Sequence, residues 1–165
     1  MRMVRLMVVV SLSLLLLSCI TFSDSERMRV SDFRDFESWF RVTDEPLIGA
    51  GNGPLLGRHL EEEGMREVYI NEIGRGGFDG GRNLFPKGTV IVKDTHYVSR
   101  DGGKGRRWNI TVMRKREAGY DPEHNNWEYV TAGPTKFIRV QGTYPLCIEC
   151  HVFAREQDYV FTWPQ

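Results

Sequence analysis

The C-terminal part of the chain contains Cys147-Ile148-Glu149-Cys150-His151, a C-x-x-C-H sequence typical of c-type haem attachment. In such a site two thiols reach the two vinyl groups of one porphyrin, and the next residue presents an imidazole nitrogen to the iron. On one helical turn, Cys147, Cys150 and His151 occupy positions i, i+3 and i+4, so all three project from one face. We therefore predict that the two cysteines bind one covalent haem c and that His151 is the proximal iron ligand.

A C-x-x-C sequence can also form a redox dithiol or half of a zinc site. A redox dithiol usually follows a strand in a βαβ unit, and the surrounding sequence has no such alternation. A four-ligand zinc site needs two more close-set ligands, but His59, His96 and His124 are scattered singly. The added histidine and the export signal described next favour haem attachment.

Residues 1–18 have the features of an export signal. Arg2 and Arg5 lie near the start, and an apolar run of 12 residues, Leu6 to Leu17, follows them. That run is too short to span a bilayer comfortably. The run ends in L-L-S-C, which resembles the lipobox of bacterial lipoproteins and implies cleavage before Cys19 and acylation of that residue. The alternative is an ordinary signal peptide that happens to end near a cysteine. We expect an exported bacterial lipoprotein, anchored to a membrane and periplasmic or at the cell surface.

The chain has three cysteines. If Cys19 carries lipid and the other two carry haem, none remains for a structural disulfide. Export and haem attachment also agree with each other, because c-type haem is attached outside the cytoplasm.

Removal of the first 18 of 165 residues leaves 147, the size of one domain. The loss of Arg2 and Arg5 reduces the 22 basic residues to 20 against 22 acidic ones, a net charge of about −2. That near-balance gives no support to nucleic-acid binding. We expect a lipid-anchored tether over residues 19–31 and one haem domain over residues 32–165.

The first part of the domain is expected to be helical. Ser31 is a candidate N-cap for a helix over 32–42. Residues 49–53 are rich in glycine and indicate a loop, after which Pro54 and Gly64 are suited to begin and end a second helix. The aromatic residues that recur at helical spacing in the first helix are Phe33, Phe36, Phe40 and Trp39.

From residue 66 the apolar period changes to two, which predicts strands. A glycine-rich loop is expected over 75–82, a hairpin turn at 101–103, and a short haem helix over 145–155. The chain should therefore form an α+β domain, mainly an antiparallel β-sheet, with N-terminal helices and a short C-terminal haem-binding helix. The predicted strands are 67–71, 89–98, 107–116, 127–131, 136–141 and 158–163.

The haem motif alone is shared by many cytochromes. Its C-terminal position, behind an F-P-x-G-T-x-x-x-K strand and before D-Y-V-F-T, is much more specific. Further distinctive blocks are 68–71, 85–93, 112–113 with 116–122, 127–129, and the motif with 158–162. Together these blocks, which span residues 32–163, resemble those of the cytochrome P460 family, which includes the β-type cytochromes c′.

The resemblance implies an antiparallel sheet domain with a pentacoordinate c-type haem and one of two activities. Cytochromes P460 oxidise hydroxylamine and carry a lysine covalently bonded to the porphyrin edge, whereas the β-type cytochromes c′ bind nitric oxide and lack that bond. Lys93 matches the cross-linking lysine, and Lys87 is a weaker match. Lys93 shares a strand face with Ile91 and Tyr97, and Asp94 lies on the opposite face. The alternative is that Lys93 is a solvated or ion-paired lysine.

The resemblance also implies a distal pocket, in which P460 enzymes use a carboxylate and β-type cytochromes c′ use aromatic caps. A redox partner protein would accept the electrons, and homodimers are common in the family. Two other hypotheses are a six-coordinate electron-transfer cytochrome, with Met113, Met65 or a histidine as the sixth ligand, and a structural lipoprotein without a redox role. The candidate distal residues are the carboxylates Glu72, Asp94 and Glu128 and the aromatics Phe78, Phe85 and Tyr97.

Overall fold

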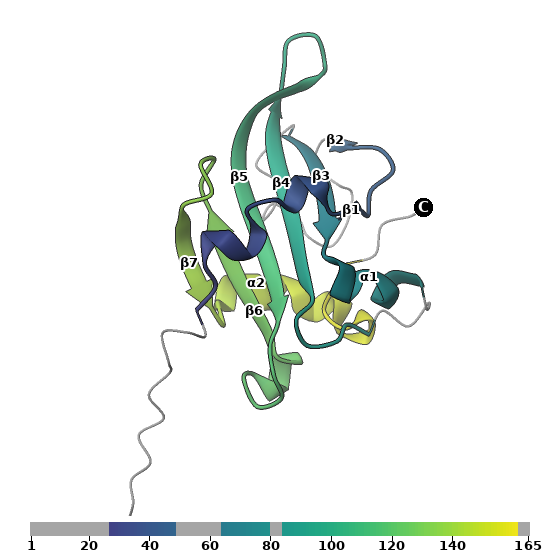
Figure 1. The fold of residues 1–165 in the computed structure, drawn as a ribbon, viewed down its shortest axis with the longest axis vertical. Helices are drawn as coiled ribbons and strands as arrows, with labels where there is room; N and C mark the ends of the chain where they lie inside the picture. Colours follow the sequence, from purple (N-terminus) through teal and green to yellow (C-terminus); the bar gives the residue numbers. More distant parts are fainter. Residues whose placement is uncertain (1–26, 49–63, 80–83, 162–165) are drawn as a thin grey trace, which may run out of the picture.

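The computed structural model describes residues 27–48, 64–79 and 84–161. The export signal, Cys19, the loop at 49–53 and most of the helix predicted from Pro54 lie outside these residues. Their strands form one antiparallel sheet in the order β1-β3-β4-β5-β6-β7, and β2 also pairs with β3 (Figure 1). The strands are β1 (Phe40–Arg41), β2 (Leu47–Ile48), β3 (Gly64–Ile70), β4 (Val90–Val98), β5 (Lys104–Lys115), β6 (Trp127–Ala132) and β7 (Ile138–Gly142).

The long hairpin of β4 and β5 forms the centre of the sheet. Its register places Ile91 opposite Met113 and Lys93 opposite Thr111. The predicted turn at 101–103 is confirmed: the Gly102 amide donates to the carbonyl of Ser99 at 2.9 Å, and Gly102 has a φ of 83°, which glycine adopts without strain. β-Branched residues at alternate positions give this hairpin two apolar faces.

Each face of the sheet carries its own buried cluster. The N-terminal segment crosses one face, which we call the far face, and the C-terminal helix crosses the other, the motif face (Figure 1). Adjacent strand residues point to opposite faces, so Val92 belongs to the far face and Ile91 to the motif face. The far-face cluster includes Phe33, Phe36, Tyr69, Val90, Val92, Ile110, Val112 and Val130. The motif-face cluster includes Val68, Ile70, Phe85, Ile91, Met113, Trp127, Tyr129, Tyr159 and Val160.

The predicted helix over 32–42 is wrong. The segment forms two short 3-10 turns, Val30–Phe33 and Phe36–Ser38, and then enters β1. Phe33 and Phe36 are fully buried, and their three-residue spacing matches the 3-10 period, which points both rings at the sheet. Ser31 is not the cap, because Arg29 precedes the first turn and its amide donates to the Asp32 carboxylate at 2.8 Å.

The predicted loop at 75–82 is also wrong over its described residues, 75–79, because these belong to α1, which spans Glu72–Asp79. The Asn71 side chain begins the helix: its amide oxygen accepts from the Gly74 amide at 3.1 Å, as in an N-cap. A Cβ on Gly74 would lie 2.6 Å from Ile70, and one on Gly77 would lie 2.5 Å from Phe85. These glycines therefore allow α1 to pack closely on the motif face rather than opening a loop.

The C-terminal helix α2 spans Pro145–His151 and continues as a 3-10 segment, Val152–Gln157. The predicted strand over 158–163 is wrong in its described part, since Asp158 and Tyr159 have positive φ and reverse the chain. The other predicted strands are confirmed with shifts at their ends, and the fold class is confirmed as α+β dominated by antiparallel sheet. Among the described residues, no helix has the length and apolar character needed to cross a membrane.

Candidate haem site

Helix α2 holds the C-x-x-C-H residues against the motif face. Pro145 occupies its first turn, where a missing N–H costs nothing, and the Cys147 amide donates to the Tyr144 carbonyl at 3.0 Å. Cys150 is buried, and Cys147 packs against the motif-face cluster. The helix therefore places both thiols and His151 on one side, as predicted from their spacing.

His151 is held in a defined tautomer. Its Nδ1 lies 2.7 Å from the carbonyl oxygen of Tyr159. Because a carbonyl only accepts, Nδ1 carries the proton, and Nε2 is the ring nitrogen that bears the lone pair with which an imidazole binds a metal. Burial lowers the pKa of the His151 imidazole to about 4; the bond to Tyr159 opposes that shift and the charge of Lys93 adds to it. The neutral imidazole is the form that binds iron.

The two thiols are not joined to each other. Cys147 and Cys150 are both free cysteines. Burial raises the pKa of the Cys147 thiol to about 11, while the charge of Lys93 opposes this shift and Cys150 adds to it. Both sulfurs are thus available for thioether bonds. Within the described residues, no group of three or more His, Cys, Asp or Glu side chains is arranged to hold a metal ion.

Lys93 lies close enough to the motif to affect both groups. It is on β4, opposite Val68 of β3, and it follows the motif-face residue Ile91 by two positions. Its charge acts on the pKa of both Cys147 and His151. Lys87, by contrast, is 69% exposed and pairs with Glu117 at 3.7 Å. Of the two matched lysines, the structure therefore brings Lys93 to the motif.

Aromatic rings surround the imidazole, and the sequence did not assign them a role. The ring centroids of Tyr129 and His151 are 5.2 Å apart, and Phe161 lies 5.5 Å from His151 on its edge. The Tyr129 hydroxyl is buried and has no hydrogen-bond partner among the described residues. Alternation along β6 could have placed Tyr129 on this face, since Trp127 two residues earlier is apolar and buried there.

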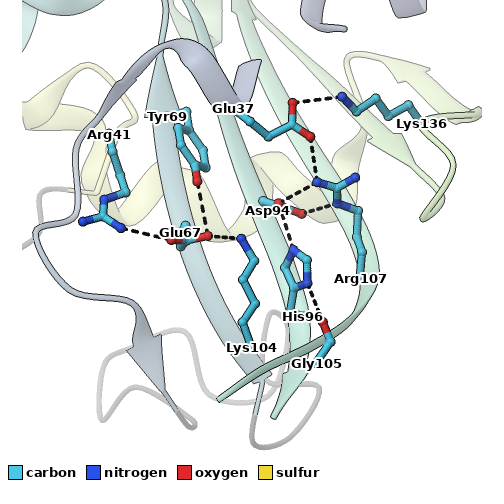
Figure 2. Close-up of polar contacts among 10 residues, drawn as sticks. All are labelled: Glu37, Arg41, Glu67, Tyr69, Asp94, His96, Lys104, Gly105, Arg107 and Lys136. Atoms are coloured by element: carbon cyan, nitrogen blue, oxygen red, sulfur yellow. Dashed lines mark hydrogen bonds and ion pairs between the residues drawn. The ribbon is translucent and has the colours of Figure 1, made fainter. Parts of the chain in front are cut away.

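Two of the three candidate distal carboxylates are on the far face. Asp94 is fully buried there and accepts from the Arg107 guanidinium at 2.7 Å and from His96 at 2.9 Å (Figure 2). Glu128 follows the same alternation and is paired with Arg114 at 2.6 Å. Strand alternation therefore excludes both side chains from the motif face.

The third candidate carboxylate and the candidate aromatic caps do not lie together at one site. Glu72 begins α1 with its side chain 87% exposed. Phe85 is buried in the motif-face cluster and meets Trp127 edge-on at 5.8 Å. Tyr97 is 44% exposed and stacks on Trp108, and the side chain of Phe78 lies outside the described residues.

The two methionines proposed as sixth ligands are separated by the sheet. Met113 belongs to the motif-face cluster. Met65 alternates with Glu67 and Tyr69 and so faces the other way. Nδ1 of His124 lies 3.0 Å from the Asp121 carboxylate, and its ring packs edge-on against Tyr159 at 6.1 Å.

The residues present fit a c-type haem. Two free thiols and an imidazole whose proton is on Nδ1 form the donor set that such a haem requires. The cluster beside them is mainly apolar, and within the part of the chain that the structure describes the buried hydroxyl of Tyr129 lacks a partner. A buried polar atom of this kind usually marks a missing partner.

A family model described as Cytochrome P460 matches residues 34–162, well over half of the chain. The Cys147 and Cys150 pair agrees with the c-type motif that this family implies. A search of the curated proteins found no match.

Proposed function

This chain belongs to the cytochrome P460 family, and on that basis we propose that it holds one c-type haem with an open axial position and oxidises hydroxylamine there. The observation that carries the proposal is the position of Lys93. It shares the motif face with Cys147 and His151, and its charge acts on both. A lysine that bonds the edge of a porphyrin attached to the two cysteines would have to lie near them, as Lys93 does.

Each residue of the motif has a separate role in this proposal. Cys147 and Cys150 add their S–H bonds across the two vinyl groups, which forms two thioethers and needs no oxidant. His151 binds iron through Nε2, while its Nδ1–H stays bonded to Tyr159. When bound, the haem would supply the redox chemistry for hydroxylamine oxidation, and a separate redox protein would be the electron acceptor.

The export signal and Cys19 support an extracytoplasmic location. We propose that the mature protein is a lipoprotein, anchored through Cys19 and facing the periplasm or the cell exterior. Haem attachment in the same compartment is consistent with this. The tether at 19–31 would separate the membrane from the haem domain.

Binding of nitric oxide is the second candidate function, and a specific observation favours it. Asp94 and Glu128 are committed to ion pairs on the far face, so neither can take protons from hydroxylamine. The motif-face cluster is built of apolar and aromatic side chains, Phe85 and Trp127 among them. Apolar surroundings suit a small neutral ligand that is bound without turnover.

The absorption spectrum of the ferrous protein, made in a host that attaches haem, separates the two functions. The lysine bond predicts a strongly red-shifted Soret band that Lys93→Ala abolishes. Lys87→Ala is the matched control, because Lys87 is an exposed lysine just before the same strand, and it should leave the band unchanged. An ordinary five-coordinate spectrum in the wild type would overturn the enzymatic proposal and support nitric-oxide binding. Hydroxylamine-dependent reduction of an added electron acceptor then measures turnover directly.

A further inference from the structure

The carboxylate of Asp158 is a buried junction between four segments of the chain. Its Oδ1 accepts from the Lys115 ammonium at 2.5 Å, from the Trp127 indole N–H at 3.1 Å and from the Asn125 side-chain amide. Its Oδ2 accepts from the backbone N–H of Phe85 at 2.9 Å. The donors come from β5, β6, the turn before β6 and the segment before β4.

This junction is closed to solvent. Asp158 is 3% exposed and Lys115 is 8% exposed. Burial lowers the pKa of Lys115, and the bond and charge of Asp158 oppose that shift. A buried carboxylate is tolerated only when donors satisfy it. The four donors therefore fix the carboxylate, and with it the main chain of residue 158.

The main chain at this point has an unusual conformation. Asp158 and Tyr159 have φ values of 54° and 62°, two consecutive non-glycine residues in the left-handed region, which persists only where the surroundings over-determine it. Trp127 adds a second bond, from its indole N–H to the Asp158 carbonyl at 2.7 Å. The reversal directs the Tyr159 carbonyl at Nδ1 of His151, 2.7 Å away.

We propose that Asp158 is a positioning residue for the axial histidine. Its carboxylate holds the left-handed turn, the turn holds the Tyr159 carbonyl, and the carbonyl fixes the tautomer and the electron donation of His151. The inference rests on the proposed haem attachment. It goes beyond that attachment because it assigns control of the iron–histidine bond to a residue that touches neither group.

The Tyr159 carbonyl, as acceptor, should affect the strength of the iron–histidine bond. A hydrogen bond from Nδ1–H to a carbonyl raises the basicity of the imidazole and strengthens its bond to iron. Loosening the carbonyl should weaken the iron–histidine bond and make the ferrous state more favourable. We expect the equilibrium constant for reduction to rise by about tenfold, the lower end of the effects of such outer partners, equivalent to about 59 mV for one electron.

The test compares Asp158→Asn with Asp94→Asn in the haem-loaded protein. Asparagine keeps the size of the side chain and tolerates positive φ, but its NH₂ group would face one of the present donors. Asp94 is the matched control, because it is a fully buried carboxylate with charged donors on the far face. The readouts are the iron–histidine stretching band of the ferrous protein by resonance Raman spectroscopy, the reduction potential and the thermal unfolding midpoint.

The proposal expects Asp158→Asn to shift the stretching band to lower frequency and the potential upward. Asp94→Asn should lower the unfolding midpoint and leave both haem readouts unchanged. Equal band positions in wild type and Asp158→Asn, with haem attached in both, would overturn the proposal. So would an equal shift in both variants, which would mark a general loss of stability.

A second variant covers the case in which Asp158→Asn yields no holoprotein. Lys115→Met removes the charged donor but keeps the three neutral ones, and it should shift the band in the same direction by a smaller amount. An unshifted band in Lys115→Met, with its ion pair to Asp158 lost, would then count against the proposal. If the wild type itself carries no covalent haem, the proposed function fails, and that outcome is seen on a denaturing gel stained for haem before any variant is compared.

Discussion

The rings of Tyr129 and His151 lie 5.2 Å apart at an interplanar angle of 54°, with the Tyr129 hydroxyl buried and without a partner. Burial also raises the pKa of that hydroxyl, so it stays protonated and can donate. An unpaired buried donor beside the axial ligand destabilises the haem-free protein. It becomes stabilising once a polar group of the haem or its ligand accepts its hydrogen bond.

We therefore expect Tyr129→Phe to have opposite effects in the two forms of the protein. In a haem-free Cys147→Ala/Cys150→Ala background it should raise the free energy of unfolding by about 1 kcal/mol, because an unsatisfied group is removed. In the haem-loaded protein the same substitution should lower the free energy of unfolding. Tyr159→Phe is the control, since the Tyr159 hydroxyl donates to the Glu123 carbonyl at 2.9 Å and its loss should cost stability in both forms. Equal effects of Tyr129→Phe in both forms would contradict the expectation that the Tyr129 hydroxyl gains a partner when haem is bound.

The polar contacts that Glu67 makes on the far face should make the free energy of unfolding depend on pH (Figure 2). Burial raises the pKa of this carboxyl, but bonds from Lys104, Arg41 and Tyr69 outweigh burial and hold the pKa below its usual 4.5. Because the folded pKa is the lower one, the contribution is complete above about pH 4.5 and is lost as pH falls through the folded value. Glu67→Gln should cost about 1 to 3 kcal/mol at neutral pH.

Chemical denaturation of wild type and Glu67→Gln across this pH range checks the expectation. The difference between the two free energies of unfolding should be constant near neutrality and shrink below about pH 4.5. Glu156→Gln is the control, because Glu156 is 88% exposed and pairs with its neighbour Arg155; it should change stability by less than about 0.5 kcal/mol. A difference for Glu67→Gln that persists unchanged into acid would refute the ion-pair account.

The glycines of α1 give a matched pair of substitutions. A Cβ on Gly74 would press on Ile70 at 2.6 Å, whereas one on Gly76 would meet nothing within 4 Å. Gly74→Ala should therefore cost about 1 to 3 kcal/mol through overpacking, and Gly76→Ala should stabilise by about 0.5 to 1 kcal/mol through helix propensity. Thermal unfolding of both variants measures this. Two stabilising substitutions would mean that α1 does not pack on the sheet as described.

Met113→Leu separates the open-site proposal from a six-coordinate electron carrier. Met113 is in the motif-face cluster, and leucine conserves its volume at a cost under about 1.5 kcal/mol. If the iron has an open site, the ferrous spectrum should be the same in both proteins. A low-spin wild type that becomes high-spin in Met113→Leu would identify Met113 as the sixth ligand and overturn the proposal.

The period-two pattern was enough to predict the central strands, because their alternate residues bury two faces. The same alternation put Lys93 and Asp94 on opposite faces, as the structure confirms. The motif spacing predicted that the thiols and His151 share one side of a helix. These features depend on side-chain type and spacing alone, which a sequence displays directly.

The features that the sequence did not reveal depend on the main chain or on close packing. The acceptor for His151 is a backbone carbonyl, which every residue has, so nothing marks Tyr159 as the partner. The positive φ of Tyr159 is likewise imposed by the Asp158 junction rather than by its own preference. Gly77 resembled a loop residue because glycine lowers helix propensity, while the contact that requires it is with Phe85, outside the helix.

The division of the sheet into two separate clusters bears on how this protein could be engineered. On β4, residues such as Ile91 and Lys93 meet one environment, and Val92 and Asp94 meet another. A combinatorial library confined to motif-face positions could vary ligand preference while every far-face contact is retained. Substitutions on the two faces should combine with little epistasis when their side chains share no partner, so variants selected on one face could be transplanted onto scaffolds stabilised on the other.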